Sequence, residues 1–246
     1  FDQWAFVNEY CKRNPDENGS HINNVLMRLL DIKNRQIGII TLNKDLNIDE
    51  VTDIFIRINS QGTKLNQADF AMSKIAANTE YGGNTLRKAI DYFSHLAIEP
   101  DWYGEMVKDT IFVKTPYFNK LKWLKDDRET IFDPDYNDIL RIAFMYKFGR
   151  AKLKDLVNLL GGRDFETREY KALIAEESFA KLSEGVIDFM NQYTFANFIL
   201  GIKGAGFISN KLINSQITLD FAYTLYLLLN NDNAIEKSQI KHYVAK

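Results

Sequence analysis

Apolar residues recur along most of this chain at the three- and four-residue intervals that are typical of amphipathic helices. This spacing predicts helices within residues 4–13, 20–30, 84–97, 153–160 and 167–192. One short β-branched run, residues 37–42, is the best strand candidate. Only four prolines occur in 246 residues, which favours long uninterrupted helices. We therefore expect a mainly α-helical, multi-helix protein with at most one short strand or small hairpin.

Residues 49–59 fit two patterns. Alternate isoleucines would share one face of a strand, whereas four apolar residues spaced i, i+3, i+4, i+7 would share one face of a helix. The helical pattern is longer, and it begins with Asp49 and Glu50, whose negative charges suit a helix N-terminus. We therefore interpret this segment as a helix.

Helix boundaries suggest two helical lobes. Asn66, followed three residues later by Asp69, predicts a capped helix start, and Asp133-Pro134 predicts another with proline in its first turn. Residues 99–116 carry two prolines and mixed charge, so we expect a break there, between domains at residues 1–98 and 99–246. The stretch 219–229 is apolar nearly all round and is predicted to be the most buried helix.

Charge and composition exclude several classes of protein. The formal net charge is −2, which excludes a chain that is basic overall but allows a local basic patch. The single cysteine, Cys11, excludes an intrachain disulfide and a cysteine-rich zinc site. No apolar run approaches the length of a membrane span, and no secretory signal opens the chain, so we expect a cytoplasmic protein. The chain starts at Phe1 and ends within a helical pattern, which indicates part of a longer protein.

Familiar catalytic motifs are missing from the sequence. The glycines of residues 201–206 have the wrong spacing for a dinucleotide fingerprint, and no phosphate-binding loop motif occurs. The three histidines lie far apart, and the acidic residues between 126 and 138 are best explained by a solvated loop and helix caps. We therefore expect no catalytic residue, metal site or cofactor in this part of the protein.

Two basic stretches are candidates for nucleic-acid binding. The first places Lys120, Lys122 and Lys125 among aromatic residues, and the second contains Arg150 and Lys152. Phosphate contacts combined with aromatic stacking are typical of a groove for single-stranded nucleic acid. The simpler interpretation is an amphipathic helix whose lysines face water while its aromatic residues face the core.

Residues 54–65, with the sequence Ile-Phe-Ile-Arg-Ile-Asn-Ser-Gln-Gly-Thr-Lys-Leu, resemble a known motif. Together with residues 68–70 and 73–75, they are similar to the Phe-x-Arg-Ile-Asn-Ser-x-Gly-x-x-Leu motif of the GmrSD-type restriction endonuclease N-terminal domain family, in the ParB/sulfiredoxin-like group. Residues 211–216 and 221–229 look like the later helical region of longer family members. The Asp-Gly-Gln-Gln-Arg segment of that family does not occur here, nor does a His-Asn-His nuclease module.

The resemblance implies the helical portion of a bacterial, nucleotide-dependent DNA restriction or phage-defence protein. Its missing flanking domains would supply catalysis, with nucleoside triphosphate and Mg²⁺ as cofactors and DNA as the partner. The alternative function is a non-catalytic helical module for protein interaction or scaffolding.

Arg57 marks the choice between these functions. It can form a surface ion pair with Asp53, four residues earlier on the same helix, which would contribute little stability. By the resemblance, a nucleotide- or phosphate-binding site would instead comprise Arg57, Asn59, Ser60 and Gly62, where a guanidinium fork suits a phosphate.

Overall fold

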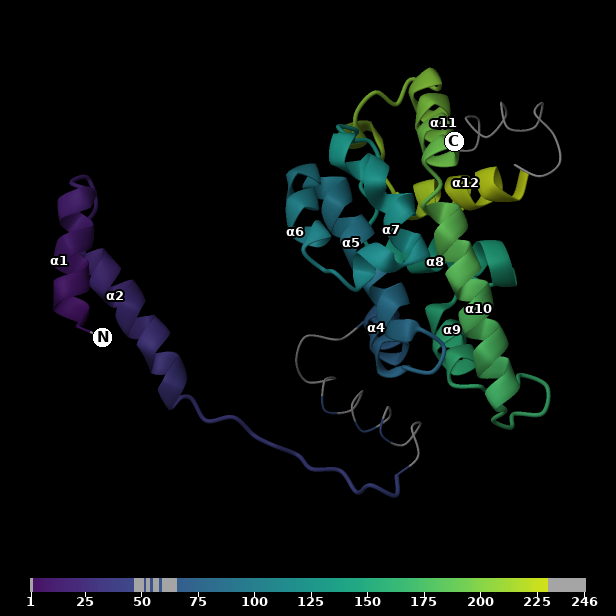
Figure 1. Cartoon of the computed structure of the whole chain (residues 1–246), viewed down its shortest axis with the longest axis horizontal. Coiled ribbons are helices and arrows are strands. Elements are labelled where there is room, and N and C mark those ends of the chain that lie inside the picture. The colour runs from purple at the N-terminus through teal and green to yellow at the C-terminus, as the bar shows by residue number, and fades with distance from the viewer. Residues whose placement is uncertain (1, 47–50, 52–53, 55–57, 59–65, 230–246) are drawn as a thin grey trace. The chain divides into compact units, whose positions relative to one another are not determined.

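The computed structural model describes residues 2–46, 51, 54, 58 and 66–229 (Figure 1). The chain divides into two compact units, residues 1–62 and 63–246. Both are built from helices, which confirms the predicted mainly α-helical class. Across the described residues, the β structure is one isolated antiparallel bridge, between Arg163 and Tyr170. None of the helices in those ranges is long and apolar enough to cross a membrane.

The first unit begins with a helical hairpin. It contains α1 (Gln3–Arg13), α2 (Gly19–Leu30) and the 3₁₀ helix η1 (Asp31–Asn34). Gln3 Nε2 donates to Asn23 Oδ1 at 2.7 Å and so joins the two α-helices. Val7 is the large apolar side chain that this hairpin buries.

The strand predicted at residues 37–42 is wrong. These residues form no strand, and Ile37, Ile39 and Ile40 are 82%, 82% and 64% exposed. A strand needs a neighbour for its backbone hydrogen bonds, and none of the described residues supplies one. The helix predicted at 49–59 lies mostly outside the described residues; the three residues of it that are described, 51, 54 and 58, are helical.

The second unit begins with α4 (Gln67–Ala77) and α5 (Gly83–Ile98). The predicted capping box of α4 is confirmed: Asn66 Oδ1 accepts from Asp69 N at 2.9 Å, and Asp69 Oδ2 accepts from Asn66 N at 2.8 Å. Tyr136 Oη donates to the other oxygen of Asp69 at 2.6 Å. The cap of α4 is therefore tied to the start of α8, 67 residues later in the chain.

Short helical pieces follow α5. They are η2 (Pro100–Trp102), α6 (Tyr103–Val107), η3 (Phe112–Lys114), α7 (Pro116–Leu121) and η4 (Lys122–Asp126). Lys88 Nζ lies 2.5 Å from Asp109 Oδ2, and the rings of Tyr92 and Phe112 meet edge to face at 4.7 Å. The domain boundary expected between residues 98 and 99 thus lies inside the second unit, where packing continues across it.

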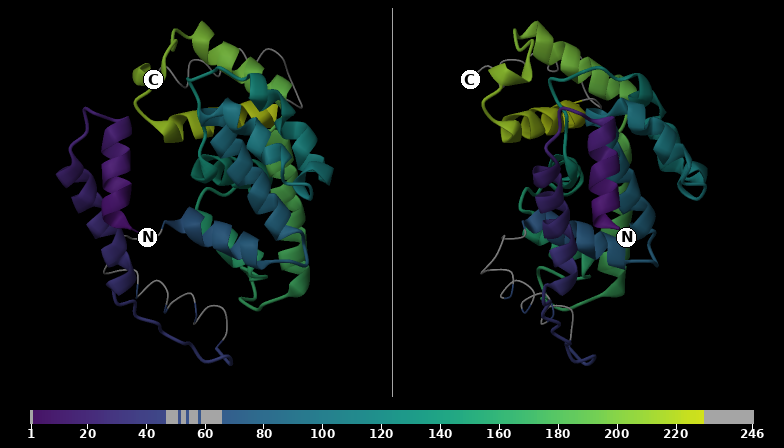
Figure 2. Two further views of the ribbon diagram at one scale, coloured as in Figure 1. Left: turned by 60° about the vertical axis from the view of Figure 1, so that its left-hand side comes forward. Right: turned by 90° about the vertical axis from the view of Figure 1, so that its left-hand side faces the viewer.

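The rest of the second unit consists mostly of longer helices. They are α8 (Tyr136–Phe148), α9 (Leu153–Leu160), α10 (Ala172–Phe189), α11 (Gln192–Gly204) and α12 (Gln216–Leu229), with the short η5 (Asn210–Leu212) before α12. Helix α8 packs against both α10 and α12 (Figure 2). The predicted end of α9 at Gly161-Gly162 is confirmed, and Gly162 takes the positive φ of 86° that favours glycine.

Two details of this unit differ from expectation. Helix α8 starts after Asp135 rather than at Asp133-Pro134, because the Asp135 side chain accepts from the backbone N–H groups of Asn137 and Asp138. Helix α12 is not buried on all sides, since Ile217 and Phe221 are 62% and 51% exposed. The polar residues Asp220 and Thr224 of this helix are buried, so polarity does not mark its exposed side.

Aromatic side chains form much of the core. The rings of Phe93, Phe132, Phe189 and Phe198 each contact Phe195 or Tyr223 at centroid distances of 4.8–6.2 Å. Tyr223 is fully buried and donates from its hydroxyl to Phe189 O at 2.9 Å. This cluster fixes the end of α10 and the start of α11, where the candidate site lies.

Candidate functional site

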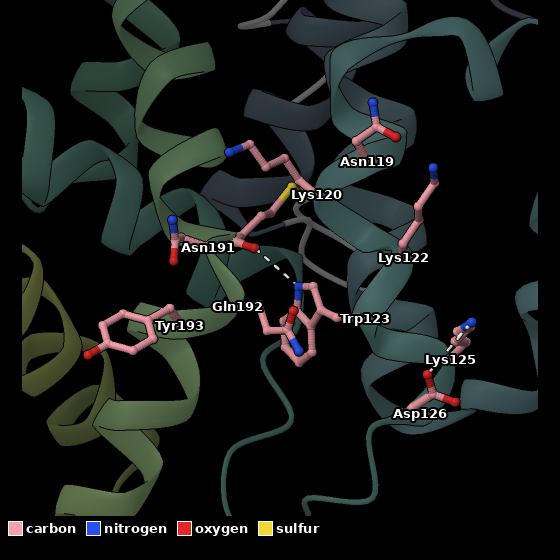
Figure 3. A pocket seen from close by; sticks show the side chains of 10 residues that line it. Asn119, Lys120, Lys122, Trp123, Lys125, Asp126, Asn191, Gln192 and Tyr193 are labelled. Atoms are coloured by element: carbon pink, nitrogen blue, oxygen red, sulfur yellow. Dashed lines mark hydrogen bonds and ion pairs between the residues drawn. The ribbon is translucent and has the colours of Figure 1, made fainter.

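A hollow of about 540 Å³ opens between the α7–η4 segment and the junction of α10 with α11 (Figure 3). We call it the lysine pocket. Its lining consists of Asn119, Lys120, Lys122, Trp123, Lys125, Asp126, Met190, Asn191, Gln192 and Tyr193. The volume lies within the range of sites that bind small molecules or single nucleotides.

Trp123 forms the floor of the lysine pocket. Its indole Nε1 donates to Met190 O at 3.3 Å, which joins η4 to the end of α10 (Figure 3). Its ring packs against Phe93 and Phe195 at centroid distances of 5.9 and 5.5 Å. The floor is therefore anchored in the aromatic core, and its hydrogen bond connects the two walls.

Three lysines give the pocket its positive charge. Lys120 lies in the last turn of α7, and Lys122 and Lys125 follow on η4. All three border one opening. Lys122 Nζ lies 5.1 Å from the ring centroid of Phe118. Lys125 Nζ lies 3.8 Å from Asp126 Oδ2, and both side chains are more than half exposed, so water screens this pair. The pocket lining thus opposes three lysines with one aspartate.

The opposite wall consists of neutral polar groups. Asn191 caps α11, and its Oδ1 accepts from Thr194 N at 3.0 Å. Gln192 and Tyr193 then form the exposed first turn of α11. Amide side chains donate and accept hydrogen bonds, and the N-terminal end of a helix carries partial positive charge. This wall therefore adds to the attraction for an anion that the lysines produce.

The two predicted basic stretches do not meet in this pocket. Arg150 lies after the C-terminal end of α8, 3.4 Å from Asp155 Oδ2, with its guanidinium 4.5 Å from the ring centroid of Phe165. Lys152 is the exposed residue that precedes α9. Only the first stretch, with Lys120, Lys122 and Lys125, lines the hollow.

The predicted phosphate-binding residues cannot be placed. Arg57, Asn59, Ser60 and Gly62 all lie outside the described residues. Their proposed role therefore continues to rest on the motif.

Part of the acidic stretch comes together beside η4. Glu129 Oε2 lies 2.5 Å from Lys203 Nζ on α11. Burial, together with the charges of Asp127 and Glu129, raises the pKa of Asp133 to about 6. In the part of the chain that the structure describes, no group of three or more potential ligands is arranged to hold a metal ion.

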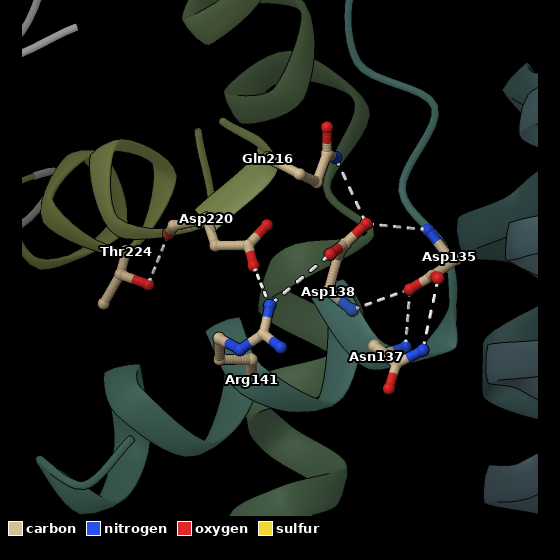
Figure 4. Close-up of polar contacts among 7 residues, drawn as sticks. All are labelled: Asp135, Asn137, Asp138, Arg141, Gln216, Asp220 and Thr224. Atoms are coloured by element: carbon tan, nitrogen blue, oxygen red, sulfur yellow. Dashed lines mark hydrogen bonds and ion pairs between the residues drawn. The ribbon is translucent and has the colours of Figure 1, made fainter. Parts of the chain in front are cut away.

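A second polar cluster is buried between α8 and α12 (Figure 4). Arg141 binds Asp220 and also lies 3.6 Å from Asp138 Oδ1. Asp138 Oδ2 accepts from Gln216 Nε2 at 3.1 Å. Burial is the largest cause of the raised pKa of both carboxyl groups. Because Asp138 and Asp220 are closed off from solvent, we assign this cluster to the packing of the two helices.

Sequence reasoning missed half of the lysine pocket. Asn191, Gln192 and Tyr193 lie about 70 residues beyond the lysines and were not singled out. The available signal was local: an Asn in a position to cap a new helix directly after Met190, where α10 ends.

Comparison with known proteins adds no relative. Searches against family models, curated proteins and solved structures each find no match. The lysine pocket and the motif in residues 54–65 are therefore the features that point to a function.

Proposed function

We propose that this chain binds nucleic acid through the lysine pocket, as the helical portion of a nucleotide-dependent DNA restriction factor. One observation carries the binding proposal: Lys120, Lys122 and Lys125 border a single hollow that contains one opposing carboxylate. Lysines that contact nucleic-acid phosphates release condensed counterions, and this release supplies most sequence-independent affinity. The net charge of −2 is compatible with such local binding.

The restriction context is supported by the motif in residues 54–65. In this proposal, Arg57, Asn59, Ser60 and Gly62 contact a nucleotide or phosphate, and the lysine pocket binds DNA. By the resemblance, hydrolysis of nucleoside triphosphate with Mg²⁺ and cleavage of DNA would not be performed by this helical portion. Lysine side chains at an open pocket attract phosphate as point charges, which suits retention of DNA rather than its cleavage.

The test compares two sets of lysine substitutions that change the net charge equally. The pocket variant carries Lys120→Gln, Lys122→Gln and Lys125→Gln. The control variant carries Lys108→Gln, Lys181→Gln and Lys211→Gln, at exposed positions of the second unit that do not line the pocket. Binding of fluorescein-labelled DNA is measured by anisotropy at low salt.

We expect the pocket variant to bind DNA roughly 10- to 100-fold more weakly than the original protein, because it loses up to three phosphate contacts. The control variant should stay within about twofold of the original affinity, because it loses the same charge but keeps all three lysines of the pocket. If both variants bind DNA more weakly by the same factor, the net charge of the protein attracts DNA rather than the lysine pocket, and the proposal fails. If neither variant changes binding, the helical interaction module becomes the better account.

A further inference from the structure

Tyr193 presents an aromatic ring at the edge of the lysine pocket. It is the second residue of α11, and its side chain is 77% exposed (Figure 3). Among the described residues it makes no hydrogen bond and packs against no other ring. Trp123 differs, because its ring is engaged by Phe93 and Phe195 and its indole N–H by Met190 O. Tyr193 is therefore the aromatic surface of this pocket that is open to a ligand.

We propose that the lysine pocket takes single-stranded nucleic acid, with one unpaired base stacked on Tyr193 and the adjoining phosphates on the lysines. This inference rests on the proposed function and names the form of its ligand. Bases stack on exposed tyrosine rings in a sequence-tolerant way, because every base has a π-face. In Figure 3 Lys122 and Lys125 lie on one side of Trp123 and Gln192 and the Tyr193 ring lies on the other, whereas Lys120 extends towards Asn191. Phosphates on Lys122 and Lys125 therefore lie apart from a base on Tyr193.

A duplex does not satisfy this arrangement. Each base in a duplex has both faces covered by its neighbours, and exposing a face costs unstacking free energy. A single strand offers its bases without that cost. The amides of Asn119, Asn191 and Gln192 also line the pocket, where they can donate to or accept from a sugar or a base edge. The same chemistry serves single-stranded DNA and single-stranded RNA.

An acidic polypeptide would use the lysines but not the ring. Carboxylates attract Lys120, Lys122 and Lys125 as phosphates do, whereas a stacking surface gains nothing from a flexible acidic side chain. The exposed ring therefore favours nucleic acid over acidic protein as the occupant.

The test replaces Tyr193 and measures anisotropy with the full chain. Four nucleic-acid probes of about ten nucleotides are compared: single-stranded oligothymidylate, single-stranded oligouridylate, a duplex and an abasic strand. Polyglutamate serves as the acidic polypeptide. Tyr193→Leu should weaken binding of oligothymidylate about tenfold, and Tyr193→Phe should keep it within about twofold, because phenylalanine retains the ring. Melting temperatures confirm that both variants fold.

The abasic strand separates this inference from the proposed function. We expect the abasic strand to bind the original protein about as weakly as oligothymidylate binds Tyr193→Leu, and to be unaffected by that substitution. If abasic strand and oligothymidylate bind equally, and both depend on the lysines, stacking is refuted while phosphate binding stands. The inference is also overturned if the duplex binds more tightly than the single strand. It is likewise overturned if Tyr193→Leu weakens the binding of polyglutamate. The oligouridylate arm decides whether RNA is accepted as well as DNA.

Discussion

Arg141 on α8 forms an ion pair with Asp220 on α12, although the two residues are 79 positions apart in the chain. Asp220 is fully buried, and the Arg141 side chain is 24% exposed (Figure 4). Asp138 Oδ1 lies 3.6 Å from Arg141 Nη1, the same nitrogen that contacts Asp220. One arginine therefore lies within ion-pair distance of two buried carboxylates, and this cluster joins α12 to α8.

Arg141→Met is expected to destabilise the protein by roughly 2–4 kcal/mol. Removing one partner of a buried pair leaves the remaining charge without compensation, and here two carboxylates lose their partner. Asp220→Asn is the matched variant: it removes one negative charge and leaves Arg141 beside Asp138, so we expect a change below about 1 kcal/mol. Urea unfolding at pH 8, above the raised pKa of about 7 of Asp220, measures both. Equal losses for the two variants would contradict this account of the cluster.

Asp133 makes stability depend on pH. Burial and the neighbouring charges of Asp127 and Glu129 raise its pKa to about 6, above the ordinary value of 3.8. Between pH 4 and pH 6 the folded carboxyl keeps a proton that the unfolded one has lost. Protonation therefore favours the folded state, and this contribution is lost as the pH rises through 6.

Asp133→Asn should remove that contribution. The variant should match the original protein near pH 4 and exceed its stability by about 1 kcal/mol at pH 7, after allowing for solvent screening of a half-buried group. Unfolding by urea across pH 4–7 checks the difference. Asp109 does not contribute to the pH dependence between pH 4 and pH 7. Its hydrogen bond to Lys88 is the largest cause that lowers its pKa to about 2, so it titrates below this range. A constant difference between the variants at all pH values would refute the assignment.

Gly185 permits the close packing of α10 against α8. A methyl group added there would lie 3.1 Å from Ala143 O and 3.2 Å from Ala143 Cβ. Gly185→Ala should therefore destabilise the protein by about 1–2 kcal/mol, because the two helices must separate. Gly201→Ala, on α11, meets no atom within 4 Å and should stabilise by about 0.5–1 kcal/mol through helix propensity. Thermal unfolding of both variants tests this, and a stabilising Gly185→Ala would show that the crossing is loose.

Local signals in the sequence were sufficient for some elements. The capping box of Asn66 and Asp69 joins residues three apart, so it can be predicted without knowledge of the tertiary structure. The start of α8 was misplaced by two residues, because Asp133, Pro134 and Asp135 all carry helix-start signals and only the contact with Asp138 selects among them.

Signals that depend on distant partners were not sufficient. The β-branched residues 37–42 have the composition of a strand, but strand formation requires a second strand that no local pattern specifies. Likewise, the basic stretch containing Lys120 was visible in the sequence. Its opposite wall, with Gln192 and Tyr193, became part of the pocket only because the chain returns there at the end of α10.

The salt dependence of DNA binding tests the central proposal most directly. The affinity of the original protein and of the triple variant Lys120→Gln, Lys122→Gln, Lys125→Gln is measured for a single-stranded oligonucleotide over a range of salt concentrations. If the three lysines contact phosphate, the slope of log affinity against log salt concentration should be steeper by about 2 for the original protein than for the triple variant. Equal slopes for the two proteins would show that these lysines do not contact phosphate, and would contradict the account.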